Sequence, residues 1–360
     1  MLTSTAQKKR PNIASAPSVE QGEMSSHKES LPLGALFGAS RSGTTWLGTL
    51  ISSHPKVAYR FEPFHRLAKI QPDVGRSFEI LQSPQLSSED RSQIYHSLLP
   101  AYPEIEKPPF FDKDYQATLN WGREFTWPFA RKMPLVGQIF QKLYTPKTGN
   151  GQTPTLIFKQ VEMVYLIAPL LERLGAPVVY LMRHPCAVIW SRIRGQKNAL
   201  MPTGRADKLD KILRESFPEL VEQYAGQLKT NTEKEALLWR LDVECALSDC
   251  SNSPKGLPIF YEELVENTLP VVERVFEHFN LSLTQDTVSF IEDSTQTTND
   301  LWQKRGEVGI NPYFSVFRDS QAVCDRWKEE MPAEDRARVM KIVSDSKAFQ
   351  MAAEQGVWSA

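Results

Sequence analysis

The sequence of 360 residues predicts an α/β fold, in which a mostly parallel central sheet is covered by helices on both faces. Short apolar runs with the length of buried strands alternate with longer segments of helical length. Glycine, proline and other small or polar residues separate the two kinds of segment. The five strand candidates are residues 34–38, 57–61, 155–159, 177–182 and 257–261.

The expected helices begin or end at residues that favour helix ends. The first stops near His54-Pro55, because a residue that precedes a proline avoids the helical conformation. Pro185 suits the first turn of a helix, and Gly175 suits the position just past the end of another. The expected helices span residues 45–51, 164–174, 185–193, 233–247 and 262–279.

Three segments stand outside this alternation. Residues 1–30 are polar and lack the apolar core of a signal peptide, so we expect a disordered tail before one domain at 31–350. Residues 63–150 are rich in proline and aromatic side chains without a strong period. They predict an insertion of helices and loops beside the core, on the side of the acceptor. Residues 199–230 are polar and predict a mobile cover.

Bulk properties exclude several classes of protein. The formal charge is −1, so no basic excess indicates a nucleic-acid partner, and an anionic ligand needs a local cluster of cations. No apolar run reaches the roughly 18 residues of a membrane span. The four cysteines lack CxxC spacing and the six histidines are scattered, which favours reduced thiols in a cytoplasmic protein and no metal site. A homo-oligomer stays open.

A loop of small and polar residues follows the first strand, at Gly38-Ala39-Ser40-Arg41-Ser42-Gly43-Thr44-Thr45. Between a strand and a helix, backbone N–H groups and the helix dipole converge on an anion, and glycines let the backbone approach it closely. Arg41 adds a fixed charge with a bidentate fork. The hydroxyls of Ser42, Thr44 and Thr45 add donors. The loop therefore predicts a phosphate site, although a plain turn between strand and helix fits the same residues.

The spacing Gly38-x-x-x-x-Gly43 is that of a nucleotide-triphosphate loop, which requires Lys and then Ser or Thr after the second glycine. Here Thr44 takes the lysine position, and the positive charge lies inside the loop at Arg41. The sequence therefore disfavours a kinase or ATPase of the standard kind, and a small-molecule kinase stays the rival enzyme.

A second anion site is predicted where the strand at 177–182 leads into the next helix. Arg183 lies at the carboxyl end of this strand, and Ser191 lies two turns into the helix, with Arg192 and Arg194 nearby. Ligands of parallel sheets bind outside the carboxyl ends of the strands. Alone, a strand-end arginine suits a surface ion pair, but beside the loop at 38–45 it favours a second phosphate.

Three stretches, in order along the chain, resemble sulfotransferases that use 3′-phosphoadenosine 5′-phosphosulfate (PAPS). Gly38–Leu47 resembles their 5′-phosphosulfate loop, Arg183–Ser191 their 3′-phosphate element, and Phe260–Val265 their Tyr-Glu-Asp/Glu-Leu strand end. The resemblance covers about residues 33–62 and 155–345, and it is closer to carbohydrate and bacterial-type members than to cytosolic members with a histidine base. It implies a P-loop nucleotide-hydrolase-like sulfotransferase fold, a three-layer sandwich, with PAPS as co-substrate and no metal.

Carried over to this chain, the resemblance implies that the 5′-phosphosulfate is held by Arg41, Ser42, Gly43, Thr44, Thr45 and Trp46. It implies that Arg183 and Ser191 hold the 3′-phosphate. The departures are Ser40, where the family usually has proline, and Arg41, where cytosolic members have lysine. Arg326-Trp327-Lys328 resembles the basic–Trp–basic element that closes over the nucleotide. An amphipathic helix with Trp327 packed and both cations solvated fits these three residues equally.

Sulfuryl transfer needs a base for the acceptor proton, and Glu62 in Phe61-Glu62-Pro63 is the candidate. It resembles the glutamate element of carbohydrate-type sulfotransferases, and it suits the role if burial raises its pKa toward the working pH. The alternative is a surface glutamate before a turn proline. His65 is the rival base, whereas His54 is expected only to end a helix. Lys159 is expected to contact the acceptor or the bridging oxygen, unless it is a solvated strand-end lysine.

The resulting hypothesis is transfer of a sulfuryl group from PAPS to a hydroxyl of a glycan, a glycolipid or a small natural product. The alternatives are the small-molecule kinase and a non-catalytic nucleotide-binding protein. Aromatic side chains of the insertion suit an apolar acceptor wall, or equally a satellite core. They are Phe110, Phe111, Trp121, Phe125, Trp127 and Phe129.

Overall fold

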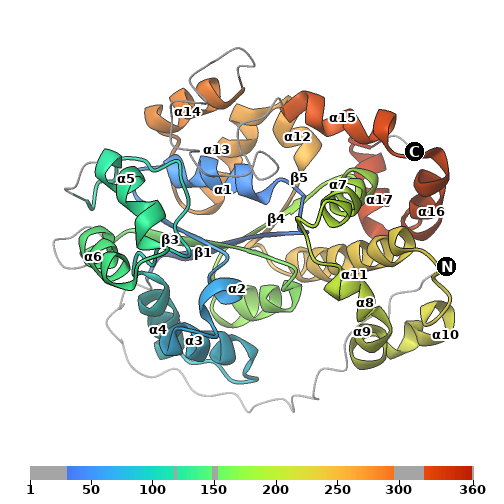
Figure 1. The fold of residues 1–360 in the computed structure, drawn as a ribbon, viewed down its shortest axis with the longest axis horizontal. Coiled ribbons are helices and arrows are strands. Elements are labelled where there is room, and N and C mark those ends of the chain that lie inside the picture. The colour runs from blue at the N-terminus through green and yellow to red at the C-terminus, as the bar shows by residue number, and fades with distance from the viewer. Residues whose placement is uncertain (1–30, 117–119, 148–152, 296–319, 359–360) are drawn as a thin grey trace, which may run out of the picture.

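The computed structural model describes residues 31–116, 120–147, 153–295 and 320–358. The tail predicted at residues 1–30 lies outside these ranges. The described chain forms three layers, with one sheet between two layers of helices, as Figure 1 shows. The predicted fold class is therefore confirmed.

The sheet contains five parallel strands in the order β2-β3-β1-β4-β5. The strands are β1 (Leu33–Gly38), β2 (Val57–Phe61), β3 (Thr155–Val161), β4 (Val178–Met182) and β5 (Gly256–Phe260), close to the predicted bounds. Because all strands are parallel, the segments that leave their carboxyl ends meet at one edge of the sheet. β1 is the middle strand, so its loop lies between the ends of β3 and β4.

Helices account for most of the remaining described chain. In order they are α1 (Thr44–Ser53), α2 (Pro63–Leu67), α3 (Pro72–Gln82), α4 (Ser88–Leu98), α5 (Asn120–Ala130), α6 (Pro134–Tyr144), α7 (Pro185–Lys197), α8 (Gly204–Asp207), α9 (Leu209–Ser216), α10 (Val221–Tyr224), α11 (Asn231–Ser251), α12 (Tyr261–Glu266), α13 (Thr268–His278), α14 (Gln285–Thr295), α15 (Ser320–Glu330), α16 (Ala333–Val343) and α17 (Lys347–Glu354). The helices predicted at 45–51, 185–193 and 233–247 are α1, α7 and α11. The one expected at 262–279 is divided into α12 and α13.

Both faces of the sheet are buried. Phe37 and Tyr180 point into a core that includes α3, α4, α7 and α11, whereas Leu36 and Leu181 point into a core that includes α1 and α13. Figure 1 shows α3, α4 and α11 on one side of the sheet and α1 and α13 on the other. Strands that are covered on both faces carry continuous apolar runs, which is why the sequence predicts them.

The helix predicted at 164–174 is irregular. It begins as a 3₁₀ turn, η1 (Val164–Leu166), and ends as a π-helical turn, η2 (Pro169–Arg173), in which the Leu174 N–H donates to the Pro169 carbonyl. Pro169 has no N–H to donate, and its ring crowds the carbonyl of the preceding turn. The prediction of one regular helix was wrong for this physical reason.

The polar segment 199–230 contains α8, α9, a 3₁₀ turn η3 (Pro218–Leu220) and α10. Ala206, Leu209 and Leu213 are buried in the main core, so sparse apolar anchors hold an otherwise polar surface segment in place. That this segment moves as a cover stays a prediction.

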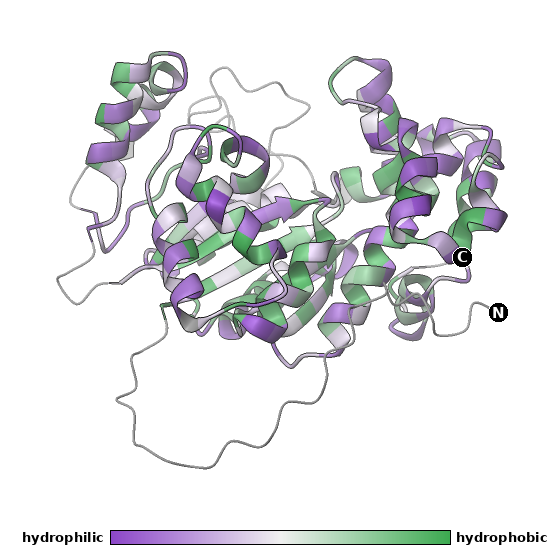
Figure 2. Cartoon of the chain, turned by 90° about the horizontal axis from the view of Figure 1, so that it is seen from below, coloured by the Kyte–Doolittle hydropathy of each residue, from purple (hydrophilic) through white to green (hydrophobic). Residues whose placement is uncertain are grey.

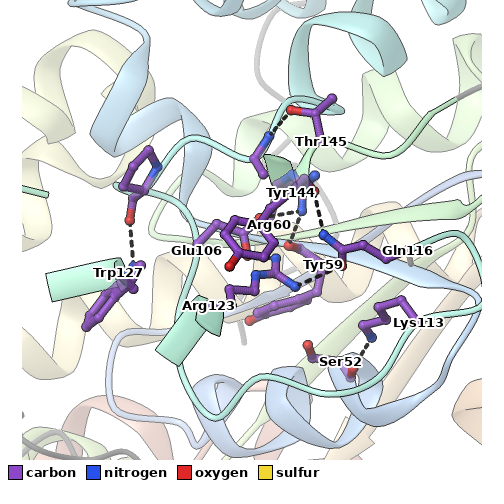
Figure 3. Close-up of polar contacts among 12 residues, drawn as sticks. Ser52, Tyr59, Arg60, Glu106, Lys113, Gln116, Arg123, Trp127, Tyr144 and Thr145 are labelled. Carbon is purple, nitrogen blue, oxygen red and sulfur yellow. Dashed lines mark hydrogen bonds and ion pairs between the residues drawn. The ribbon is translucent and has the colours of Figure 1, made fainter. Parts of the chain in front are cut away.

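The segment between β2 and β3 forms α2 to α6, and a buried ion network ties it to the sheet. Arg60 of β2 donates from Nη1 to Glu106 Oε1 at 2.8 Å, and Arg123 of α5 forms an ion pair with Oε2 of the same carboxylate. Figure 3 shows these contacts, together with the Trp127 N–H that donates to the Pro103 carbonyl at 2.9 Å. One carboxylate thus fixes α5 against the end of the sheet.

Lys113 lies beside this network, and burial lowers its pKa to about 7. Its ammonium donates to the carbonyls of Ser52 and His54. Between pH 7 and its ordinary pKa, the folded chain binds fewer protons at Lys113 than the unfolded chain, so stability rises with pH. We expect the unfolding free energy of the wild type to gain about 1 kcal/mol relative to Lys113→Met between about pH 7 and pH 8.

Urea unfolding at both pH values measures this difference, with Lys142→Met on exposed α6 as the matched control. A difference between wild type and Lys113→Met that is independent of pH would contradict the assignment.

Candidate active site

A cavity of about 770 Å³ opens at the carboxyl edge of the sheet. Residues at or just beyond the ends of β1, β2, β3 and β4 line it together, as expected for parallel strands that end at one edge. The predicted site residues in its lining are Arg41, Gly43, Thr44, Thr45, Trp46, Glu62, Lys159 and Arg183. Most of these residues lie in a loop or at a strand end that the sequence predicts, so short segments of sequence determine where they are.

The loop after β1 turns sharply into α1. Gly43 has φ of 97°, and a Cβ at this position would lie 2.4 Å from the ring of Tyr261, so only glycine fits. α1 begins at Thr44, which directs the positive end of its dipole and its first N–H groups toward the loop. The predicted phosphate loop is thus formed by backbone that a side chain at position 43 would disrupt.

The two predicted anion sites are in direct contact. Arg183 Nη1 donates to the Arg41 carbonyl at 3.3 Å, and Arg41 Nε donates to Ser191 Oγ at 3.1 Å. Arg183 therefore points toward the turn at 41–45, and Ser191 reaches the site through Arg41 rather than by lining the cavity itself. One small ligand with two anionic groups could therefore contact both sites at once.

The end of β5 supports Arg183. The Arg183 guanidinium lies 4.4 Å from the ring centroid of Tyr261, and its Nη2 donates to the Val323 carbonyl at 2.8 Å. Glu262 accepts a hydrogen bond from the His184 N–H at 3.0 Å, which joins the β5 end to the turn that carries Arg183. The Tyr-Glu stretch thus positions the arginine.

Several buried donors at this edge lack a partner within the described ranges. They are Ser42 Oγ, Trp46 Nε1 and Arg183 Nε. Buried polar groups normally have a hydrogen-bond partner, and an unmade bond costs free energy. Unpartnered donors of this kind are expected in a site that binds the oxygen atoms of an anionic ligand.

Glu62 follows β2 and forms an ion pair with Lys159 of β3. Arg66 of α2 lies 3.9 Å from the same carboxylate. Burial raises the pKa of Glu62, but the charge and hydrogen bond of Lys159, with the charge of Arg66, outweigh it, so the pKa lies below its ordinary value. Burial lowers the pKa of Lys159, and Glu62 opposes this. The condition set from the sequence, that burial raise the pKa of Glu62 toward the working pH, is not met in this structure.

Strained backbone gathers at the cavity. Arg41, Glu62 and Glu162 have φ of 75°, 52° and 60°, in the left-handed region that side chains other than glycine rarely adopt. Each lies within three residues of a strand end, and all three line the cavity. Such strain persists where the surrounding structure enforces it, typically at functional sites.

Sequence reasoning missed most of the charge in the cavity. The basic lining residues outnumber the acidic ones by nine to four; they are Arg41, Arg66, Lys107, Arg131, Lys159, Arg183, Arg192, Arg205 and Lys208, against Glu62, Glu104, Glu106 and Glu162. Glu162 pairs with Arg192 at 3.3 Å, and Arg205 pairs with Asp242 at 2.6 Å. The composition, with its net charge of −1, concealed this local excess.

The histidines have different positions. His65 of α2 lines the cavity and stays the rival base, with partial burial holding its pKa below the ordinary value. His54 is buried, with Nε2 hydrogen-bonded to the Ser282 carbonyl at 3.0 Å, and it follows the last residue of α1. It ends the helix, as predicted.

The structure does not bring Arg326, Trp327 and Lys328 into the cavity lining. Trp327 stacks on His184 with ring centroids 4.2 Å apart, whereas Arg326 and Lys328 are exposed and pair with Glu330 and Asp325 on their own helix. This is the arrangement of an amphipathic helix with a packed tryptophan. Of the described aromatic side chains of the insertion, Trp127 lines the cavity, Phe110 and Phe111 pack in the cores, and Phe125 and Phe129 are exposed. The Trp121 side chain lies outside the described part.

Comparisons with known proteins found one matching family and several similar solved structures. The family model described as "Sulfotransferase domain" matches residues 35–349. The solved sulfotransferase domain of the Synechococcus PCC 7002 olefin synthase is 15% identical over 95% of this chain and 100% of that one, with a TM-score of 0.44. Mouse sulfotransferase SULT7A1 complexed with PAP is 11% identical over 91% of this chain and 89% of that one, with a TM-score of 0.46. A comparison with curated proteins found no match.

Within the described ranges, every helix is too short or too polar to cross a bilayer. The family match covers nearly the whole of the described domain, including the loop after β1 and the turn after β4. The chain therefore belongs to the sulfotransferase family.

Proposed function

We propose that the chain transfers the sulfuryl group of PAPS to a hydroxyl of a glycan, a glycolipid or a small natural product and releases adenosine 3′,5′-bisphosphate. The observation that carries this proposal is the contact of Arg183 and Ser191 with Arg41. It joins a strand-end arginine to a phosphate-type loop, beside a carboxylate and a lysine in the same cavity. A donor with separate 3′- and 5′-anions suits this arrangement.

In this proposal the loop residues Arg41 to Trp46 hold the 5′-phosphosulfate through backbone N–H groups, hydroxyls and the start of α1. Arg183 and Ser191 hold the 3′-phosphate. The unpartnered Arg183 Nε supports this role, because the guanidinium retains a free donor after its contacts with the Arg41 and Val323 carbonyls.

Glu62 and Lys159 would carry out the proton and charge transfers. The Glu62 carboxylate accepts the proton of the acceptor hydroxyl. At the same time the oxygen of this hydroxyl bonds to sulfur, and the bond from sulfur to the bridging oxygen of the donor breaks. The Lys159 ammonium stabilises the negative charge left on that oxygen, which departs with the bisphosphate. Positioning and charge stabilisation supply most of the rate in related phosphoryl transfers.

The Glu62–Lys159 ion pair implies an order of events. While Lys159 is paired with Glu62, it holds the pKa of the carboxylate low, and the carboxylate is a weak base. If the Lys159 ammonium contacted the sulfuryl donor instead, its interaction with Glu62 would weaken, and burial would then raise the pKa of Glu62. The base would then gain strength when the donor is in place.

Lys159→Met tests this coupling through the pH profile of kcat/KM. Without Lys159, the pKa of Glu62 rises, so we expect the acidic limb of the profile to move to higher pH and kcat to fall by at least about tenfold. Lys107→Met is the matched control, because Lys107 lines the same cavity and lies 4.8 Å from the Phe61 ring centroid. Its acidic limb should stay in place. An unmoved limb in Lys159→Met would contradict the coupling.

The reaction itself is tested with labelled PAPS and a metabolite extract, by mass spectrometry of the labelled products. We expect a product heavier by one sulfuryl group and one equivalent of the bisphosphate. Parallel incubation with ATP and magnesium tests the kinase alternative. Phosphorylated product without sulfated product would overturn the proposal in favour of a kinase, and the absence of both would favour a non-catalytic binding protein.

A further inference from the structure

The hairpin of α5 and α6 exposes a run of large apolar side chains, which we call the hairpin face. Each is between 51% and 75% exposed; they are Phe125, Phe129, Met133, Leu135, Ile139 and Leu143. Three other large apolar side chains of the described chain are exposed, and they are scattered: Ile70 after α2, Tyr165 in η1 and Leu269 on α13. The hairpin face is therefore a concentrated patch rather than ordinary surface variation.

The spacing of these residues gives each of the two helices a row of exposed apolar side chains. Leu135, Ile139 and Leu143 repeat every four residues along α6, and the Phe125 and Phe129 rings of α5 are in contact, with centroids 5.9 Å apart. Residues four apart lie on one side of a helix. Figure 2 shows this part of the chain at the periphery of the molecule, away from the sheet.

The opposite side of the same hairpin is already occupied. Trp127 and Ala130 of α5 pack with Phe140 and Tyr144 of α6 in a small core of their own. The hairpin is thus apolar on both sides, and among the described residues only one side has a partner. A helix that is apolar on more than its core-facing side normally meets a second apolar environment.

Charge around the hairpin face is mostly positive, and Glu124 is the one acidic residue of α5 and α6. The chain contains no acidic residue from Phe125 to Val161. The same hairpin and its flank carry the exposed cations Arg131, Lys132, Lys142 and Lys147. Apolar side chains bordered by lysine and arginine are the pattern of helices that lie in the interface of an anionic bilayer.

We propose that the hairpin face docks on the surface of an anionic lipid bilayer. The aromatic and aliphatic side chains would enter the headgroup region, and the four cations would contact anionic headgroups. A two-fold interface between copies is disfavoured, because it would bring identical positive patches together. Trp127 and Arg131 of the same hairpin line the cavity, so docking would place the catalytic cavity beside the membrane surface. This inference does not depend on the nature of the sulfuryl donor.

Vesicle flotation of the full chain tests the proposal, with no nucleotide present. We expect binding to phosphatidylcholine vesicles that contain about one third phosphatidylglycerol, and weak binding to phosphatidylcholine alone. The double variant Phe125→Ser/Phe129→Ser should lower the bound fraction at least about tenfold. The double variant Lys132→Glu/Lys142→Glu should also lower the fraction bound to the anionic vesicles. Leu269→Ser, which changes an exposed leucine on α13, is the matched control and should bind as the wild type does.

Two results would overturn the proposal. One is equal binding of wild type and Phe125→Ser/Phe129→Ser, with both variants folded by circular dichroism. The other is a dimer by light scattering that this double variant dissociates, with no vesicle binding by the wild type, since the hairpin face would then join two copies. Failure of sulfate transfer would leave the flotation result intact, so the two proposals fail separately.

Discussion

Glu62→Gln is expected to lower kcat by about 10²- to 10⁴-fold, the range that a positioned general base contributes. Glutamine keeps the shape of the side chain and a hydrogen bond to Lys159, but it cannot take the acceptor proton. Affinity for adenosine 3′,5′-bisphosphate should stay within about twofold, because the proposed phosphate contacts come from Arg41, Arg183 and Ser191. Single-turnover kinetics and calorimetry measure the two quantities.

Two other side chains at the cavity could take the same role, and they supply the controls. Glu162→Gln leaves Arg192 paired with Glu235 at 3.0 Å and Arg205 paired with Asp242, so the surrounding charges stay compensated. His65→Asn removes the rival base on α2. Both variants should keep kcat within about tenfold of the wild type. If either loses turnover while Glu62→Gln retains it, Glu62 is not the base.

Arg183→Ala is expected to weaken the binding of adenosine 3′,5′-bisphosphate by about 100-fold or more. Truncation of one partner of a buried charged contact typically costs over 2 kcal/mol, much of it from leaving the other charge unpaired. Arg183 is buried, and it holds the loop carbonyl of Arg41 as well as the proposed phosphate. Isothermal titration calorimetry with the bisphosphate gives the affinity directly.

The controls for this variant separate binding from folding. Arg194→Ala removes a neighbouring cation on α7 that is partly exposed and pairs with Glu330, and its affinity should match the wild type. Arg183→Lys keeps the charge but loses the fork and the guanidinium over the Tyr261 ring, so an intermediate affinity is expected. Thermal unfolding shows whether Arg183→Ala remains folded. Wild-type affinity in folded Arg183→Ala would remove the residue from the site.

The sequence located those parts of the molecule that depend on local chemistry. Strands β1 to β4 are buried almost throughout, β5 is buried at its end, and the loop after β1 needs glycine at position 43 for its backbone. Arg183 was placed by a general property of parallel sheets, since any residue just past β4 must lie at the ligand edge. These features need no knowledge of distant contacts.

Features that depend on contacts between distant segments could not be predicted from the sequence. The ion pair of Glu62 with Lys159 joins residues 97 positions apart, and it reverses the direction of the Glu62 pKa shift. Arg205 reaches the cavity from α8, in a crossover whose path no local pattern specifies. The basic–Trp–basic pattern left two interpretations open, and only the packing of Trp327 on His184, which joins α15 to the start of α7, favours the packed tryptophan.

The central claim is that two adjoining anion sites recognise an adenosine with separate 3′- and 5′-phosphates. Its most direct test is the ratio of affinities for adenosine 3′,5′-bisphosphate and 5′-AMP, measured by calorimetry in the wild type and in Arg183→Ala. We predict that the wild type prefers the bisphosphate by at least about tenfold and that the variant loses this preference. Equal wild-type affinities for the two nucleotides, or a preference that persists without Arg183, would contradict the account.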